Sequence, residues 1–221
     1  MKFRNSFLTC VALLFMAPSF AQKIKWQTGG DLAFLKGQKE LATSYNYTDV
    51  TVLGENEQTY VAHQKEELNK DKPGDGDAFA SEWTEARTKK YEPSFEKLMN
   101  KRLEDDGIAV KSGTQAKYTV MVATGDMQLG KGKTFTRKPA KVNFVISIVE
   151  TANPSNVLAK GILEEVEGEV NAPRGSGWIP GGAGTVMSVT ANVQNRDYSN
   201  RIAKSYEKAG EILAKAIHKS L

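Results

Sequence analysis

Cysteine is almost absent from this chain of 221 residues, since Cys10 is the only one. A single thiol can form neither an internal disulfide nor a zinc site of several thiolates. Histidine is scarce as well: His63 and His218 fall in separate segments of helical spacing, each without a second imidazole nearby. Because a zinc site needs three or four converging ligands, we expect no metal site, and we assign no cofactor.

Long apolar runs are missing outside the first 21 residues. Within them, Lys2 and Arg4 precede the apolar run Phe7–Met16, and small residues end the segment at Ala21. This run is too short to span a bilayer, which takes about 20 residues. Residues 1–21 therefore have the pattern of a signal peptide cleaved before Gln22, and we expect the remaining chain to be periplasmic or secreted.

Neither sign of charge dominates the sequence. Lys and Arg number 30 and Asp and Glu number 26, which gives a net charge of +4. Without the two basic residues of the leader, 28 basic residues face 26 acidic ones, a net charge of +2. Proteins that bind nucleic acid usually carry a strong basic excess. We therefore expect no nucleic-acid partner and, beyond the leader, no transmembrane segment.

Residues 41–221 are predicted to form a single α/β domain, preceded by a polar amino-terminal extension over residues 22–40. Runs of β-branched and aromatic residues predict strands, and apolar residues at steps of three and four predict helices. Strands are expected over 41–52, 117–124, 141–150 and 157–170, and helices over 57–70, 78–105 and 197–221. Pro93 should kink the second helix or divide it in two.

The order of these elements favours an α/β sandwich, in which a mixed sheet with a central antiparallel hairpin over 118–170 is covered by helices 78–105 and 197–220. The strand at 117–124 is apolar at successive positions, which is typical of a central strand covered on each side. A turn at Asn153-Pro154 would give the hairpin a register in which paired residue numbers sum to about 307.

Three carboxylates, Glu165, Glu167 and Glu169, alternate along one predicted strand and would share a face. Two carboxylates at a suitable separation can act as the acid and the base or nucleophile of a glycosidase. The predicted register instead places Lys138 near Glu169, and Lys141 near the other two acids. Such cross-strand ion pairs would make this hairpin a charge-paired surface.

The preceding segment is basic, with Lys131, Lys133, Arg137 and Lys138 and no acid among them. It could meet an anionic surface such as lipid headgroups or a cell-wall polymer. Pairing with the neighbouring acidic strand is the simpler interpretation.

A loop over 172–185 holds five glycines, two prolines and the side chains of Arg174, Trp178 and Ile179. Exposed tryptophan and arginine are favoured anchors of binding surfaces. We therefore take these three residues as a hypothetical partner-binding site. The alternative is a flexible connection whose tryptophan folds back onto the core.

Four segments are distinctive: the leader end Ala21-Gln22, and residues 35–40 (LKGQKE), 91–96 (YEPSFE) and 148–155 (IVETANPS). Together they resemble a family of small secreted proteins from Bacteroidetes. That family has no established activity or catalytic residues, so the resemblance implies none.

The order of elements is similar, more distantly, to that of bacterial envelope modules related to the amino-terminal domain of TolB and to lipoprotein activators of cell-wall synthases. This resemblance implies an α/β adaptor whose partner is an envelope protein or a cell-wall component. The sequence departs from the lipoprotein members because Cys10 lies inside the apolar run and forms no usable lipobox.

We therefore predict an exported, non-enzymatic binding or adaptor module, and we assign no catalytic residues. One alternative is a periplasmic hydrolase that uses the carboxylate face at 165–169, which would need a concave pocket. Another is a carrier of a small ligand, which would need an apolar cavity inside the sandwich. The sequence determines neither the partner nor the oligomeric state.

Overall fold

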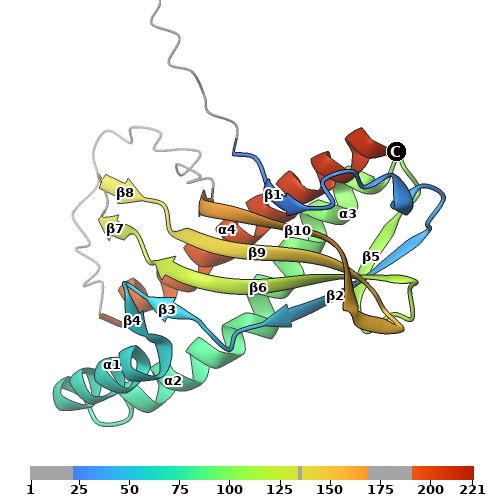
Figure 1. Cartoon of the computed structure of the whole chain (residues 1–221). Coiled ribbons are helices and arrows are strands. Elements are labelled where there is room, and N and C mark those ends of the chain that lie inside the picture. The colour runs from blue at the N-terminus through green and yellow to red at the C-terminus, as the bar shows by residue number, and fades with distance from the viewer. Residues whose placement is uncertain (1–21, 134–135, 169–190) are drawn as a thin grey trace, which may run out of the picture.

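Residues 22–133, 136–168 and 191–221 are described in a computed structural model of the chain (Figure 1). The strands are β1 (Lys25–Thr28), β2 (Glu40–Asn46), β3 (Thr51–Val52), β4 (Glu55–Asn56), β5 (Ala109–Ser112), β6 (Tyr118–Gln128), β7 (Lys131–Lys133), β8 (Thr136–Lys138), β9 (Lys141–Glu150) and β10 (Asn153–Glu167). The helices are α1 (Glu57–Asp71), α2 (Asp75–Ala86), α3 (Glu92–Leu103) and α4 (Ala191–Ser220), with a 3-10 turn η1 (Ala33–Leu35) and a π-helical segment η2 (Arg87–Tyr91).

The main sheet is mixed, as the sequence predicts. Its strand order is β1-β10-β9-β6-β2-β5, and β3 continues the sheet beside the end of β6. β6 is parallel to β2 and antiparallel to β9. The strands β7 and β8 form a separate two-stranded ribbon. One mixed sheet with helices packed on it therefore confirms the α/β class and the central hairpin.

The hairpin of β9 and β10 has the register that the sequence predicts. Its regular part runs from the pair Ala159–Ile148 to the pair Leu163–Phe144, and the residue numbers of each pair sum to 307. The turn itself is formed by Thr151-Ala152, two residues earlier than expected. An irregular pairing between Asn153 and Val157 accounts for the difference.

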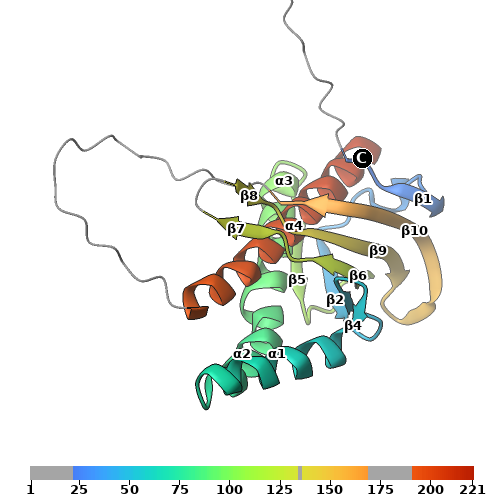
Figure 2. The same ribbon diagram turned by 90° about the vertical axis from the view of Figure 1, so that its left-hand side faces the viewer.

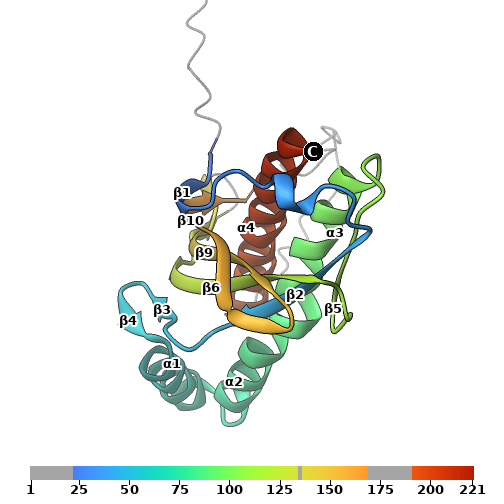
Figure 3. The same ribbon diagram turned by 45° about the vertical axis from the view of Figure 1, so that its right-hand side comes forward.

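Helices α3 and α4 lie on the same side of the sheet (Figure 3). They pack closely because Gly210 brings the two backbones together: a Cβ at this position would lie 2.3 Å from the carbonyl oxygen of Phe95. The apolar stripe predicted for the last helix is buried along α4 and consists of Tyr198, Ile202, Tyr206, Ala209, Leu213 and Ile217.

The segments α2, η2 and α3 follow one another without a break, and α1 and α2 form a helical hairpin at one end of the domain (Figure 2). Pro93 lies in the first turn of α3, and the π-helical turn directly precedes that helix. A proline ring would clash with the carbonyl of Lys89, four residues earlier, in a regular α-helix. The wider π turn accommodates it and is the predicted kink.

We predicted that residues 22–40 form an extension outside the domain. In the structure they belong to the domain. β1 is an edge strand paired with β10, and Leu32 and Leu35 are fully buried. The turn η1 also places the ring of Phe34 against Tyr118, with centroids 5.3 Å apart. The turn thus directs apolar residues of this largely polar segment into the core, while Ile24 and Trp26 pack against the core from the β1 region.

The strand predicted over 41–52 is interrupted. β2 ends at Asn46, whose side-chain oxygen accepts the backbone N–H of Thr48 at 2.8 Å. This local turn competes with the sheet for the backbone and directs the chain away before β3 begins. Sequence composition misses the break because the residues on both sides of it favour strands.

Candidate functional site

One face of the main sheet carries no helix of the described residues (Figure 3). The prediction that β6 is covered on both sides is therefore wrong. Val120 and Val122 are fully buried beneath the helices, whereas Met121 and Ala123 point the other way and remain partly exposed. We call the exposed or partly exposed residues of β2, β6, β9 and β10 on this side the open face: Ser44, Asn46, Thr119, Met121, Ala123, Gln128, Lys141, Asn143, Val145, Ser147, Lys160, Ile162 and Glu167.

The register of the strands orders the open face into rows, because directly paired residues share a face. One row is Ile162, Val145, Ala123 and Asn46, and the next is Lys160, Ser147, Met121 and Ser44. The residues in the middle of the rows are small or apolar. The ends of the rows are polar at Asn46, Ser44 and Lys160 and apolar at Ile162, beside which Lys25 of β1 lies. The face is thus a narrow apolar surface with a polar border.

Two β-bulges lie at one end of the open face, on either side of Asn143. The bulge in β6 is at Gly125-Asp126, and the bulge in β10 is at Glu164-Glu165, where Glu165 has a φ of 47°. The side-chain oxygen of Asn143 accepts the backbone N–H of Glu165 at 2.7 Å. Bulges redirect neighbouring side chains, so the two bulges determine the direction in which the acidic side chains of β10 point at this end of the open face.

The β5 edge of the sheet is closed by side chains of α3. Val110 donates its N–H to the Asn100 Oδ1 atom and accepts from Nδ2 with its carbonyl, both at 2.7 Å. One helical turn earlier, Glu96 accepts the N–H of Ser112 at 3.1 Å. Four helical residues rise about 6 Å and two strand residues about 6.6 Å, so these side chains match alternate groups of the strand. Another strand could add here only by displacing them.

The opposite edge is protected in a different way. β1 has only four residues, an exposed Lys25, and irregular pairing between Trp26 and Thr28. Short, charged and irregular edge strands resist the addition of further strands. With both edges protected, the open face is the part of the sheet that is available to another molecule.

The acidic strand is ion-paired, as the second interpretation of the sequence predicts. Lys141 Nζ lies 2.9 Å from Glu165 and 3.2 Å from Glu167, whose side chains are 67% and 47% exposed. Glu169 lies outside the described residues. A glycosidase relies on an acid held in a shielded environment beside the second carboxylate. Two exposed acids that share one lysine count against the hydrolase.

The predicted basic surface is divided between two strands. In the ribbon, Lys131 pairs with Lys138, and Lys133 and Arg137 lie between them. Lys138 is exposed, and the side chains of the other three residues lie outside the described part of the chain. An anion-binding role for this ribbon stays a prediction.

The proposed partner-binding loop falls outside the described residues. Arg174, Trp178 and Ile179 all belong to the segment 169–190, which the structure does not describe. Their role as anchors of a partner stays a prediction.

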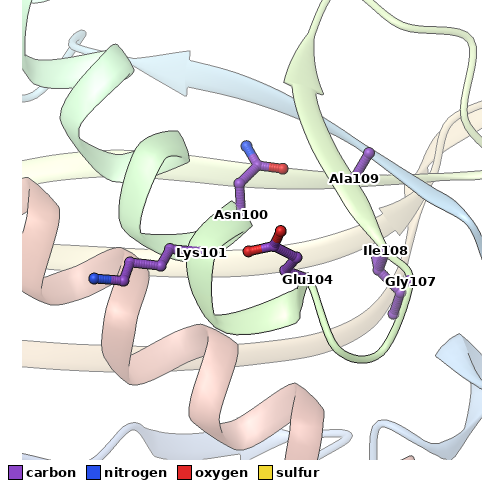
Figure 4. Close-up of a pocket in the computed structure, with 6 residues that line it drawn as sticks. All are labelled: Asn100, Lys101, Glu104, Gly107, Ile108 and Ala109. Atoms are coloured by element: carbon purple, nitrogen blue, oxygen red, sulfur yellow. The ribbon is translucent and has the colours of Figure 1, made fainter.

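A hollow of about 360 Å³ lies between the carboxyl end of α3 and β5 (Figure 4). Asn100 and Glu104 point toward it, and Lys101 points away. The amide of Asn100 is already bonded to both backbone groups of Val110. The hollow is therefore a consequence of the closed edge, and we assign no ligand to it.

Aromatic rings fill the interior between the sheet and the helices. The Tyr206 ring stacks on Tyr91 with centroids 5.1 Å apart and meets the edge of Phe144 at 4.8 Å. The Tyr206 hydroxyl is 2.6 Å from the hydroxyl of Thr124. These rings occupy the place where a carrier would hold an apolar ligand, which counts against the carrier alternative.

A polar network joins β2 to α3 on the covered side. The Tyr45 hydroxyl lies 3.2 Å from both the carbonyl oxygen of Glu92 and a carboxylate oxygen of Glu96, and Thr43 donates to the same carboxylate at 2.5 Å. Burial raises the pKa of Tyr45 and of Glu92. Because the partners of these groups come from within the network, its role is to hold the helix on the strand.

Glu211 of α4 makes stability depend on pH. Burial acts to raise the pKa of this carboxyl, but hydrogen bonds from Lys215, Lys208 and Arg102 overcome it and lower the pKa from 4.5 to about 2. A carboxyl whose pKa is lower in the folded state than in the unfolded state stabilises the protein at pH values above its unfolded-state pKa. This stabilisation is lost as the pH falls through the folded-state pKa.

We expect Glu211→Gln to lower the free energy of unfolding at pH 7 by about 2 kcal/mol. This is less than the full shift in pKa would give, because all three cations are partly exposed and solvent screens them. The difference from the unchanged protein should shrink below pH 4 and vanish near pH 2. Urea unfolding followed by circular dichroism at several pH values measures it, with the exposed Glu104→Gln as control. A difference that stays constant with pH would contradict the assignment.

No protein-family model matches the chain. No curated protein matches it either. The comparison with solved structures matches two, both of the PelC dodecamer from Paraburkholderia phytofirmans. A variant PelC is 14% identical with a TM-score of 0.31, and a second PelC structure is 13% identical with a TM-score of 0.29; each comparison covers 84% of this chain and 95% of PelC. At these values the likeness does not identify a function.

Within the described residues, none of the helices combines the length and the apolar character that crossing a bilayer requires.

Proposed function

We propose that this protein is an exported, non-enzymatic binding module of the bacterial cell envelope, which holds a partner protein against its open face. The observation that carries the proposal is the contrast between the two faces of the sheet. Helices bury one face, whereas Met121, Val145 and Ile162 remain partly exposed on the other. The signal-peptide pattern and the resemblance to envelope adaptors support the location and the class of function.

The shape of the open face suits a packed layer. Small side chains such as Ala123 and Ser147 let a second layer approach a sheet to about 10 Å, the usual spacing between packed layers. The polar border then supplies specificity and solubility, as in other protein interfaces. With strand addition hindered at both edges, a partner gains most contact by lying flat on this surface.

Affinity capture tests the proposal. The chain from Gln22 to Leu221 is used as bait in detergent-solubilised envelope of its own organism, beside a Val145→Lys variant. Lys97→Glu, which changes an exposed charge on α3, is the matched control. Each captured protein is then purified and titrated against every bait, after circular dichroism shows that each bait is folded.

We expect a partner that binds the unchanged chain and the Lys97→Glu control and binds Val145→Lys at least tenfold more weakly. A double variant, Arg174→Ala with Trp178→Ala, is included because the sequence points to that loop. A partner lost by the loop variant but kept by Val145→Lys would overturn the role of the open face. Hydrolysis of an envelope glycan by the chain would overturn the non-enzymatic class.

A further inference from the structure

We propose that a second copy of this chain covers the open face in the free protein, with the two copies packed face to face about a two-fold axis. The axis runs across the strands along the row of Ile162, Val145 and Ala123. The inference rests on the proposed function, because both treat the open face as a binding surface. The inference goes beyond the proposed function because it names a second copy of the chain as the molecule bound and states how the two copies are aligned.

The open face is complementary to itself when the strand direction is reversed about this row. On each strand, the residue two positions before the axis in one copy then meets the residue two positions after the axis in the other copy. On β9, Ser147 meets Asn143 of the second copy. On β6, Met121 meets Gly125 of the second copy, so a long side chain faces a residue that has none. Along the axis, the small or apolar Ile162, Val145 and Ala123 meet their own counterparts. The polar Lys25 and Asn46 lie at the two ends of the same row.

The charges on β10 follow the same symmetry. Lys160 lies two positions before Ile162, and Glu164 lies two positions after it. Lys160 is exposed, and the Glu164 side chain is 54% exposed and ion-paired with Lys25. Reversal about the axis places the Lys160 ammonium of each copy opposite the Glu164 carboxylate of the other. Opposite charges across an interface fix its register.

The size of the face fits a reversible pair. β6 has 11 residues, so the face is about 36 Å long, and four strands make it about 19 Å wide. Each copy would bury roughly 600–700 Å², at the lower limit of specific interfaces. A two-fold contact is closed, and protected edges oppose growth into larger assemblies. A partner with more contact area could therefore displace the second copy.

Sedimentation velocity of the chain from Gln22 to Leu221 over a range of concentrations tests the pairing. We expect a monomer–dimer equilibrium. Lys160→Glu should raise the dissociation constant at least tenfold because two carboxylates then face each other, and Glu164→Lys should do so through two ammonium groups. Lys97→Glu, with the same change of charge on α3, should leave the equilibrium unchanged.

Mixing the Lys160→Glu chain with the Glu164→Lys chain gives the sharpest result. Each variant alone has like charges across the axis, whereas a mixed pair has opposite charges at both ends. The mixture should therefore recover dimers that neither variant forms by itself. A mixture that stays monomeric would overturn the alignment.

Crosslinking locates the contact. Beyond the expected leader the chain has no cysteine, so Val145→Cys with a short thiol crosslinker should join two copies. Lys111→Cys should not, because Lys111 lies in the edge strand β5, level with Thr119 and away from the axis. A chain that is monomeric at all concentrations, or that crosslinks only at Lys111→Cys, would overturn the second copy. If Val145→Lys still loses its captured partner in that case, the proposed function stands alone. The opposite result is a chain that forms dimers and whose captured partner binds Val145→Lys as tightly as the unchanged chain. That result would overturn the proposed function instead.

Discussion

Replacing Gly210 with valine should lower the free energy of unfolding by about 3 kcal/mol, because the closest approach of α3 and α4 leaves no room for a side chain. The carbonyl oxygen of Phe95 lies 2.3 Å from where a Cβ would be, and this oxygen is fixed within α3. The helices must separate, which loosens the buried rings between them. Valine also lacks the gain in helix propensity that alanine would bring.

Chemical unfolding followed by circular dichroism measures this loss. Asn200→Val is the matched control because Asn200 is an exposed residue of the same helix. The control should change the free energy of unfolding by only a few tenths of a kcal/mol, since asparagine and valine have similar helix propensities. Equal losses for the two variants would mean that valine is costly anywhere in this helix, and that the close approach of the backbones does not require glycine at position 210.

Glu57→Ala should cost about 3 kcal/mol, since it leaves a largely buried cation without its partner. Glu57 begins α1, and its carboxylate accepts the Trp83 indole N–H at 2.8 Å and pairs with Arg87. The carboxylate side chain is 12% exposed and the guanidinium side chain 24%. Arg87 also lies over the Tyr47 ring, 4.4 Å from its centroid, so it cannot move to water without losing that contact.

A double-mutant cycle separates the ion pair from the loss of packing. The double variant Glu57→Ala with Arg87→Met should recover at least 1 kcal/mol of the loss, because methionine fills similar space and needs no polar partner. Thermal and urea unfolding of the two single variants and the double variant give the coupling energy. Strictly additive losses would mean that the pair contributes nothing beyond its separate packing contacts.

In the β9–β10 hairpin and in α4, the local sequence was enough to predict which side chains share a face. Along β9, Phe144 and Ile146 alternate with Val145 and Ser147, so a period of two puts the first pair on one face and the second pair on the other. Spacing in α4 predicted the buried stripe, including Tyr206. These predictions hold because the periods of two and of 3.6 residues are properties of the local backbone, and burial selects apolar side chains at those steps.

The candidate site needed the tertiary structure. β6 looked covered on both sides because Met121 and Ala123 are apolar like the neighbouring Val120 and Val122. Nothing in the local sequence shows whether a helix packs above a strand. The closure of the β5 edge depends on Asn100 and Glu96. The distance between these two residues matches that between Val110 and Ser112, but only once α3 lies beside β5. Composition, chain direction and hairpin register follow from the sequence by itself. Which face stays open is decided by where the helices dock, since that placement depends on packing between residues far apart in the chain.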